Sequence, residues 1–304
     1  FPFLLGHEAA GVVEAVGEGV TNVAPGDYVI LNWRAVCGNC RSCLKGKPWI
    51  CFNTYNATQK MTLTDGTALT PALGIGAFAD KSLVHEAQCT KVDDEADPAV
   101  AGLLGCGVMA GIGAAINTGA VGRDDTVAVI GCGGVGLSAI QGCKLAGCYP
   151  IIAVDVMESK LAFARELGAT HTINAAATDP VRAARELTRL GPDYAFDSVG
   201  ATATINQALQ MVRPGGTATV MGLHGTKVEA AISPAVLILA NKRLLGCFAG
   251  SSRPLVDLPK LLDLYLAGRL DLDKLISKHY ALDELPQAFD DMTSGAVARG
   301  VITF

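Results

Sequence analysis

The sequence predicts an α/β protein built on a doubly wound parallel sheet, joined to a separate β-rich region. After Val121, short apolar runs alternate with helical stretches, which is the pattern of strand–helix–strand units. Before about Leu104, short β-rich runs are separated instead by Gly, Pro and Asp turns, as in a barrel-like region. A chain of 304 residues with 50% hydrophobic and 17% charged positions is long enough to bury two such cores.

The individual elements are placed by their apolar patterns. In the β-rich part, the clearest strands are expected at 11–17 and 28–31. In the second part, we expect strands near 126–130, 151–155, 194–197, 217–221 and 244–248. The helices between them are expected over 135–146, 158–167, 180–189 and 203–212. The tail adds an amphipathic helix at 258–267 and a final strand at 300–304.

Charge and hydropathy exclude two classes of partner. The net charge is −5 and no Lys/Arg cluster alternates with aromatic residues, so we expect no nucleic-acid partner. The uncharged stretch 99–121 is long enough to span a bilayer, but its six glycines favour a buried core segment, so we expect no membrane partner. The chain shows no export leader, which predicts a cytoplasmic location.

A glycine-rich motif follows the apolar strand near 126–130. Its spacing is G-x-G-x-x-G, and a helix follows at once, which is the arrangement that binds the pyrophosphate of a dinucleotide. Asp155 ends the next expected strand, where a carboxylate can bind the ribose hydroxyls and repel a 2′-phosphate, so NAD is expected rather than NADP. The alternative is a glycine-rich turn with a chance acid. The motif consists of Gly131, Cys132, Gly133, Gly134, Val135 and Gly136.

Four cysteines lie close together in the β-rich part. The spacing Cys37-x2-Cys40-x2-Cys43-x7-Cys51 can place four thiolates around one tetrahedral ion, so we expect a zinc site. Four protein ligands leave no open position, and such a zinc is structural. The alternatives are an iron–sulfur cluster, whose usual spacing differs, and disulfides, which a large cytoplasmic chain does not need.

These features resemble the zinc-containing medium-chain alcohol dehydrogenases, and the resemblance runs over residues 6–304. The matching segments are Gly6-His7-Glu8-Ala9-Ala10-Gly11, the four-cysteine lobe, Gly105-Cys106-Gly107 and the end of the chain at 299–304. Within the family, residues 30–37 and 51–61 are similar to the mycothiol-dependent formaldehyde dehydrogenases, whereas the half after Gly222 is more like class III alcohol dehydrogenases.

The resemblance implies three parts of the chain. Residues 1–107 would form a GroES-like β-barrel catalytic domain with the zinc lobe at 37–51, and residues 108–248 a Rossmann domain that binds NAD. Residues 249–304 would return to the catalytic domain. The chain opens on Phe1 rather than Met, inside what looks like a strand and turn, so we expect that an upstream segment is missing.

The resemblance also implies a second, catalytic zinc. His7 and Cys106 would be two of its three ligands, Glu8 a neighbouring or alternate ligand, and the third a cysteine upstream of Phe1. Taken alone, His7 and Cys106 would be an ordinary turn residue and a buried thiol. By the same analogy the cofactor would contact Lys160 at the ribose, Arg299 at the pyrophosphate, and Met221 and Leu223 near the nicotinamide. Plain surface charge is the alternative for Lys160 and Arg299.

The implied function is hydride transfer between an alcohol and NAD. The alcohol would be a primary alcohol or an S-hydroxymethyl thiol adduct such as S-(hydroxymethyl)mycothiol, and the protein a homodimer or homotetramer. Tyr55 stands where glutathione-dependent members carry Arg, which disfavours glutathione adducts. Ala110 stands where many members carry Thr, so one hydrogen bond to the nicotinamide end would be missing. The alternative function is an NAD-binding protein with structural zinc and no dehydrogenase activity.

Overall fold

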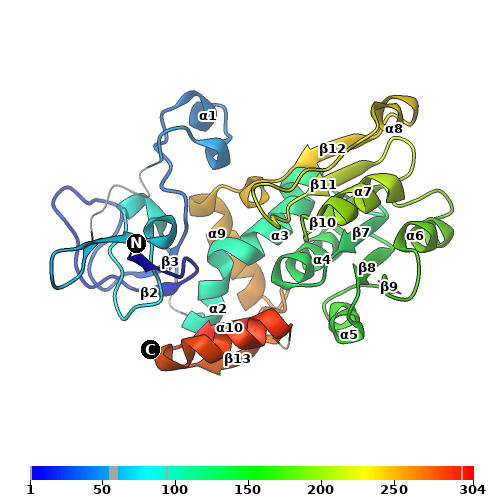
Figure 1. The fold of residues 1–304 in the computed structure, drawn as a ribbon. Helices are drawn as coiled ribbons and strands as arrows, with labels where there is room; N and C mark the ends of the chain where they lie inside the picture. Colours follow the sequence, from blue (N-terminus) through cyan, green and yellow to red (C-terminus); the bar gives the residue numbers. More distant parts are fainter. Residues whose placement is uncertain (1, 55–60, 94, 296) are drawn as a thin grey trace. The chain divides into compact units, whose positions relative to one another are not determined.

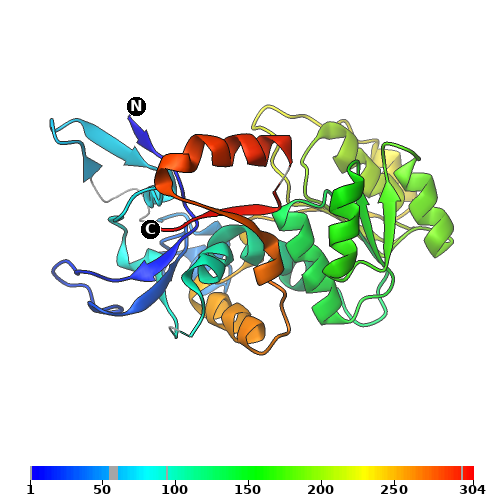
Figure 2. The same ribbon diagram turned by 90° about the horizontal axis from the view of Figure 1, so that it is seen from below.

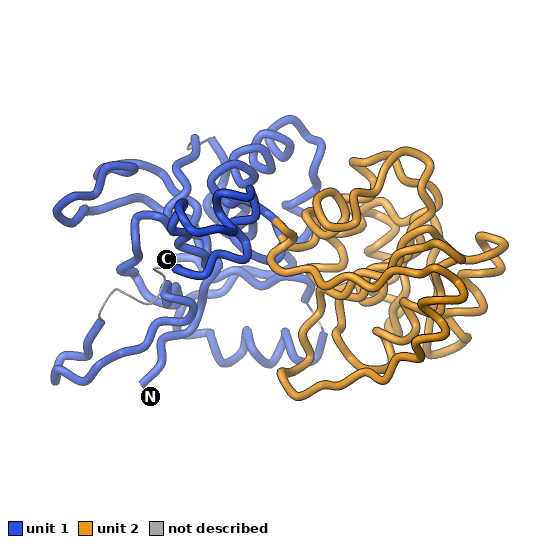
Figure 3. Tube along the Cα trace, turned by 90° about the horizontal axis from the view of Figure 1, so that it is seen from above, with its two compact units in different colours: residues 1–109, 252–304 blue, residues 110–251 orange. Residues whose placement is uncertain are grey.

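The computed structural model describes residues 2–54, 61–93, 95–295 and 297–304. The chain forms two compact units (Figure 3). Unit 1 comprises Phe1–Met109 and Ser252–Phe304, and unit 2 comprises Ala110–Ser251. Unit 2 is therefore inserted as one continuous segment into a unit that the two ends of the chain build together.

Unit 2, which is described throughout, is built on a six-stranded parallel sheet (Figure 1). The order is β12-β11-β10-β7-β8-β9, so the sheet grows outward from β7 in both directions. Ligands bind such sheets where the order reverses, beyond the carboxyl ends of β7 and β10. The expected doubly wound sheet is thus confirmed. Its strands are β7 (Val127–Ile130), β8 (Ile151–Asp155), β9 (His171–Asn174), β10 (Tyr194–Asp197), β11 (Thr217–Val220) and β12 (Arg243–Gly246).

The helices of unit 2 follow the expected pattern with one addition. The core strands β7 and β8 are buried along almost their whole length, which explains why their apolar runs are easy to identify. Strand β9 was not predicted, because it lies at the edge of the sheet and buries only Ile173. The short α8 was not predicted either. The helices are α4 (Gly134–Ala146), α5 (Glu158–Glu166), α6 (Pro180–Thr188), α7 (Thr202–Met211) and α8 (Pro234–Leu239).

The described part of unit 1 contains three small sheets. Strands β2 (Ala10–Val12), β3 (Tyr28–Leu31) and β6 (Cys89–Lys91) form an antiparallel sheet, and β3 has the predicted bounds. Strand β2 ends before the predicted 17, since the residues after it are mostly exposed. The other strands are β1 (Phe3–Leu4), β5 (Ala68–Pro71) and β4 (Met61–Thr62) in one sheet, and β13 (Ile276–Tyr280) and β14 (Arg299–Ile302) in the other.

The helices of unit 1 come from both ends of its sequence. Figure 2 shows α10 (Leu285–Ser294) lying along the β13–β14 pair, and α9 (Pro254–Leu266) packs against β6. Further helical segments are α1 (Arg41–Leu44), α2 (Pro98–Leu103) and the π-helix η4 (Leu104–Val108), besides short 3-10 turns such as η1 (Pro48–Ile50). Helices α3 (Met109–Gly113) and η5 (Ala114–Gly119) continue the same helical run into the segment assigned to unit 2.

The apolar stretch at 99–121 forms this continuous helical run, Pro98–Gly119. By length and mean hydropathy, 2.0, it could cross a membrane, and it is the one such helix among the described residues. In the fold, 78% of its most apolar 18-residue window is buried. Core helices of globular proteins have the same composition, and the small residues let neighbouring backbones approach closely, as expected for a buried segment.

Asp291 links α10 to β13 through hydrogen bonds. Its carboxylate accepts hydrogen bonds from the Tyr280 hydroxyl at 2.6 Å, from Lys278 Nζ at 2.9 Å and from Gln287 Nε2 at 2.8 Å. These donors, Tyr280 first, lower the pKa of Asp291 to about 2. A depressed carboxyl pKa stabilises the folded state above the unfolded value of about 4, and this stabilisation is lost as the pH falls through the folded value.

We therefore expect Asp291→Asn to lower Tm by a few degrees at pH 7. The difference from the parent protein should shrink as the pH falls from about 4 towards 2. Thermal unfolding followed by circular dichroism across this range measures it. The matched control is Asp290→Asn, an exposed neighbour on the same helix; a deficit of equal size at every pH would contradict the expectation.

Candidate cofactor and metal sites

The turn between β7 and α4 is fixed by glycines that leave no room for a side chain. Gly131 has φ of +89°, and its N–H donates to the Val154 carbonyl at 2.8 Å. A Cβ on Gly136 would lie 1.8 Å from the Gly131 carbonyl oxygen, so only glycine allows the helix to begin this close to the strand. A Cβ on Gly133, by contrast, would meet no atom within 4 Å. The backbone at Gly133 is thus open to a ligand.

The first turn of α4 offers unpaired backbone N–H groups. Its N-cap is Gly133, which has no side chain to accept a hydrogen bond from the first turn. The helix is 13 residues long, and its dipole places positive charge at this end. Free N–H groups and a helix N-terminus together bind phosphate, so the predicted role of the motif as a pyrophosphate cradle agrees with this geometry.

Asp155 lies at the carboxyl end of β8, beside the glycine turn. Its carboxylate accepts hydrogen bonds from Cys132 N at 2.7 Å and from Met157 N at 3.0 Å. These bonds fix the orientation of the carboxylate and leave lone pairs available for a ribose. The Cys132 thiol is buried, and burial, followed by the Asp155 charge, raises its pKa to about 12. The Lys160 charge acts on the same thiol in the opposite direction, which places Lys160 near this corner.

A second strand-end carboxylate, Asp197, was not predicted as a site residue. It ends β10, next to β7, and is completely buried. Its side chain accepts from the backbone N–H groups of Val199 and Gly200, both at 3.1 Å, and burial raises its pKa. The signal in the sequence is the acid directly after the apolar run at 194–196. Asp197 shapes the turn at the edge of the sheet where β7 also ends.

The residues after β11 are placed by the same turn. The Met221 N–H donates to the Asp197 carbonyl at 2.9 Å, and Leu223 follows with 80% of its surface exposed. Both are thus on the carboxyl side of the sheet, where the resemblance assigned them to the cofactor. Their contact with a nicotinamide stays a prediction.

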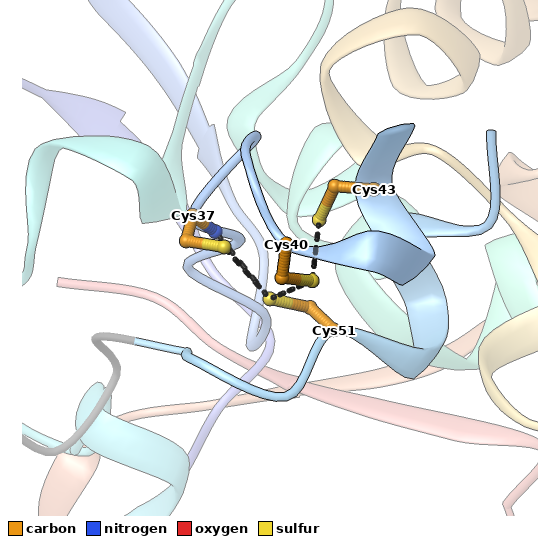
Figure 4. A group of neighbouring side chains, drawn as sticks. All are labelled: Cys37, Cys40, Cys43 and Cys51. Carbon is orange, nitrogen blue, oxygen red and sulfur yellow. Dashed lines mark hydrogen bonds between the residues drawn. The ribbon is translucent and has the colours of Figure 1, made fainter. Parts of the chain in front are cut away.

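The four cysteines predicted to bind zinc converge in unit 1 (Figure 4). Their sulfur atoms all lie within 4.8 Å of one another, and three of the separations are 3.5, 3.5 and 3.8 Å. Four sulfurs at about 2.3 Å from one tetrahedral zinc ion are about 3.8 Å apart, whereas a disulfide bond is about 2 Å long. The sulfurs belong to Cys37, Cys40, Cys43 and Cys51, all of them free thiols.

The chain around the lobe supports thiolates. Backbone N–H groups, those of Cys43 and Phe52 first, lower the pKa of Cys40 to about 6, whereas burial, followed by the hydrogen bond with Cys40, raises the pKa of Cys43 to about 12. Arg34 donates to the Cys51 carbonyl at 2.9 Å, which brings a positive charge beside the sulfurs. A donor set of four thiolates with N–H partners fits Zn²⁺.

The residues assigned to a catalytic zinc lie elsewhere in unit 1. Glu8 Oε1 accepts from the Gly107 backbone N at 2.6 Å, next to Cys106, and Glu8 Oε2 pairs with Arg299. Burial, followed by the Arg299 charge, lowers the pKa of His7, which favours the neutral imidazole that binds metals. Burial raises the pKa of Cys106 to about 11, so metal binding there would release a proton.

The residues assigned to the catalytic zinc differ from the four-cysteine group in two ways. Among the described residues, His7, Glu8 and Cys106 do not form a compact group of metal-ligating atoms like the four cysteines. Arg299, which the resemblance assigned to the pyrophosphate, makes its ion pair with Glu8. The family roles of all four residues therefore stay predictions.

The motif Gly105-Cys106-Gly107 has a steric explanation that the sequence alone could not give. Cys106 lies in the π-helix η4, a form often found at functional sites. A Cβ on Gly105 would lie 2.2 Å from the Leu31 carbonyl, and one on Gly107 would lie 2.9 Å from Arg299 Nη1. Glycine on each side of Cys106 therefore lets this helix pack against β3 and the Glu8–Arg299 pair.

Comparisons with known proteins match both parts of the chain. The alcohol dehydrogenase GroES-like domain matches residues 1–94, and the zinc-binding dehydrogenase domain matches residues 134–267. S-(hydroxymethyl)glutathione dehydrogenase of Komagataella pastoris is 36% identical over 100% of this chain and 83% of that protein. The chain belongs to the zinc-binding alcohol dehydrogenase family. The predicted resemblance is thus confirmed.

Solved structures of the family extend the match to the fold. An alcohol dehydrogenase zinc-binding domain protein from Burkholderia ambifaria superposes with a TM-score of 0.94 at 36% identity, covering 100% of this chain and 84% of that one. Benzyl alcohol dehydrogenase from Acinetobacter calcoaceticus gives 0.92 at 34% identity, covering 99% and 84%. The chain is therefore a zinc-dependent oxidoreductase, and these relatives do not favour a binding protein without dehydrogenase activity.

Two alanine variants separate the glycine roles at the cofactor turn. Gly133→Ala should leave Tm unchanged but weaken NAD binding on the order of tenfold or more, because its methyl group occupies open space that the pyrophosphate needs. Gly136→Ala should destabilise unit 2, because its methyl group overlaps the Gly131 carbonyl. Calorimetric titration with NAD and thermal unfolding measure the two effects. Unaltered NAD affinity in the folded Gly133→Ala variant would refute the cradle.

The four-cysteine lobe is tested by its metal content. Cys43→Ala should remove one zinc ion per chain and lower Tm by several degrees, because structural zinc contributes directly to folding. Metal analysis of the purified protein measures the stoichiometry. Cys89→Ala is the control, since Cys89 is buried and lies outside the group. Equal zinc content in the two variants would count against the site.

Proposed function

We propose that the protein oxidises a primary alcohol, or an S-hydroxymethyl thiol adduct, with NAD as the hydride acceptor. The observation that supports this most directly is that Asp155 accepts a hydrogen bond from the Cys132 N–H, next to the open backbone of Gly133. A carboxylate there accepts hydrogen bonds from ribose hydroxyls and repels a 2′-phosphate, and the helix N-terminus beside it attracts the pyrophosphate. Unit 2 would then be the NAD-binding domain and unit 1 the catalytic domain.

His7 and Cys106 would hold the catalytic zinc in unit 1. When bound, the zinc polarises the substrate oxygen, so that an alcohol loses its proton and an aldehyde carbonyl accepts hydride more readily. The residues of the chain supply the site around it. The low pKa of His7 keeps its imidazole neutral for binding, and Glu8 holds the Gly107 N–H, which fixes the backbone next to the Cys106 thiol.

The Glu8–Arg299 pair would keep charge balanced beside the metal. Arg299 neutralises the Glu8 carboxylate, so Glu8 is held as a neighbour of the zinc ligands while the pair persists. Lys160 would contact the ribose, and Met221 and Leu223 the nicotinamide end.

Two substrate classes fit the relatives. One relative is named for S-(hydroxymethyl)glutathione, and another relative is named for benzyl alcohol. Tyr55, which disfavours a glutathione adduct, lies outside the described residues. We favour a mycothiol adduct or a simple primary alcohol over a glutathione adduct for this reason.

We also propose a cytoplasmic homodimer or homotetramer. All ten cysteines are free thiols, which supports a reducing compartment. Strand β12 is an edge of the parallel sheet and could pair with a second subunit. Light scattering on the intact protein measures the mass, and a monomer would exclude the oligomer.

The function is tested with the intact protein by following NADH formation. The substrates are short and aromatic primary alcohols, and formaldehyde with mycothiol or glutathione. Absence of NADH formation with all of them would reject the proposal.

Asp155→Asn should lower the ratio of kcat/KM for NAD to that for NADP at least about tenfold, because the charge that repels the 2′-phosphate is gone. The amide keeps one of the two backbone hydrogen bonds that the carboxylate accepts, so Tm should fall only modestly. A parent enzyme that prefers NADP would contradict the role of Asp155.

A further inference from the structure

Cys143 and Cys148 bring two thiols together at the C-terminal end of α4. The Gly147 N–H donates to the Lys144 carbonyl and the Cys148 N–H to the Cys143 carbonyl, both at 3.1 Å, and Gly147 is left-handed with φ of 82°. This pair of bonds is the Schellman motif, in which the side chains of its first and last residues contact each other. Here these residues are both cysteines, and their thiols are hydrogen-bonded.

The pair is separate from both metal groups. Neither thiol belongs to the four-cysteine group, and both lie in unit 2, whereas the metal sites lie in unit 1. Cys143 is completely buried and Cys148 is 6% exposed, and the Cys148 thiol donates to the Gly122 carbonyl at 3.5 Å. Two sulfurs cannot complete the four-ligand set of a structural zinc, so the pair is suited to thiol chemistry rather than to metal binding.

We propose that Cys143 and Cys148 form a modification site that hydrogen peroxide oxidises reversibly to a disulfide. The Cys148 thiolate attacks one peroxide oxygen, the O–O bond breaks, and hydroxide leaves, which takes up the thiol proton as water. The sulfenic acid is then attacked by the Cys143 sulfur, the S–O bond breaks, and a second water leaves. Two thiols are thus oxidised and one peroxide is reduced to two waters.

The local geometry favours this sequence of steps. The hydrogen bond between the two thiols lowers the pKa of Cys148 and raises the pKa of Cys143, so Cys148 is the first nucleophile. Burial and the Asp125 charge act in the opposite direction on the pKa of Cys148. The second thiol is held on the same turn by the backbone bonds of the Schellman motif, so the two sulfurs react without the closure of a flexible loop. Other thiols of unit 2 have different partners: Cys132 bonds to the Val154 carbonyl and Cys247 to Thr118.

The experiment uses the zinc-loaded protein, oxidised with hydrogen peroxide at one equivalent per chain. Free thiols are then alkylated under denaturing conditions, and the protein is digested with trypsin without reduction. Trypsin cleaves at Lys144, between the two cysteines, so a disulfide joins the peptides 124–144 and 145–160. We expect this joined pair in most of the oxidised protein and its loss after dithiothreitol treatment.

The controls identify the sulfurs and test the pairing. Cys148→Ala should abolish the joined peptides and Cys89→Ala should leave them, as should Cys132→Ala, since Cys132 shares the 124–144 peptide. Recovery of Cys143 and Cys148 as alkylated thiols would overturn the proposal, and so would loss of the joined peptides in Cys132→Ala. The mapping needs no enzymatic turnover, so its outcome is independent of the proposed substrate.

Discussion

The close approach of α4 to β7 is the contact on which the cofactor site depends. No side chain fits at Gly136, and the Gly131 carbonyl lies against it. The Ser198 hydroxyl donates to the Ile130 and Gly131 carbonyls at 2.9 and 2.8 Å, which ties the turn to the segment after β10. The direction of the first N–H groups of α4 is thus set by backbone sterics and two neighbouring strands. A ligand meets N–H groups that are already oriented, so binding costs little ordering of the protein.

The metal lobe is held together in a different way from the cores. Helix α1 buries only Ser42, and the 3-10 turn Pro48–Ile50 buries no residue. Such a segment has too little apolar surface to offset the entropy of ordering its chain. Four sulfurs brought this close also repel one another once they ionise. One divalent cation supplies the binding free energy that the lobe lacks and removes the repulsion, which is why the metal replaces a hydrophobic core there.

The parts that the sequence predicted are those with a local signal. The buried strands β7 and β8, the glycine turn and the four cysteines are each defined by residues a few positions apart. Strand β9 and helix α8 were missed, because an edge strand with one buried side chain and a short helix have weak periodicity. The Glu8–Arg299 pair could not be predicted at all, since 291 positions separate its members. The family resemblance identified both residues but gave no reason to pair them.

The π-helix at Cys106 shows why motif spacing and site geometry are different kinds of information. A π-helical turn contains one residue more than an α-helical turn, and each added residue rotates the remainder of the helix by about 100°. The face on which Cys106 lies thus depends on this widened turn, which no local propensity encodes. Widening a helix costs backbone hydrogen-bond geometry, so it persists only where packing enforces it. Here the Leu31 carbonyl against Gly105, and the bond from Gly107 to Glu8, enforce it from two sides.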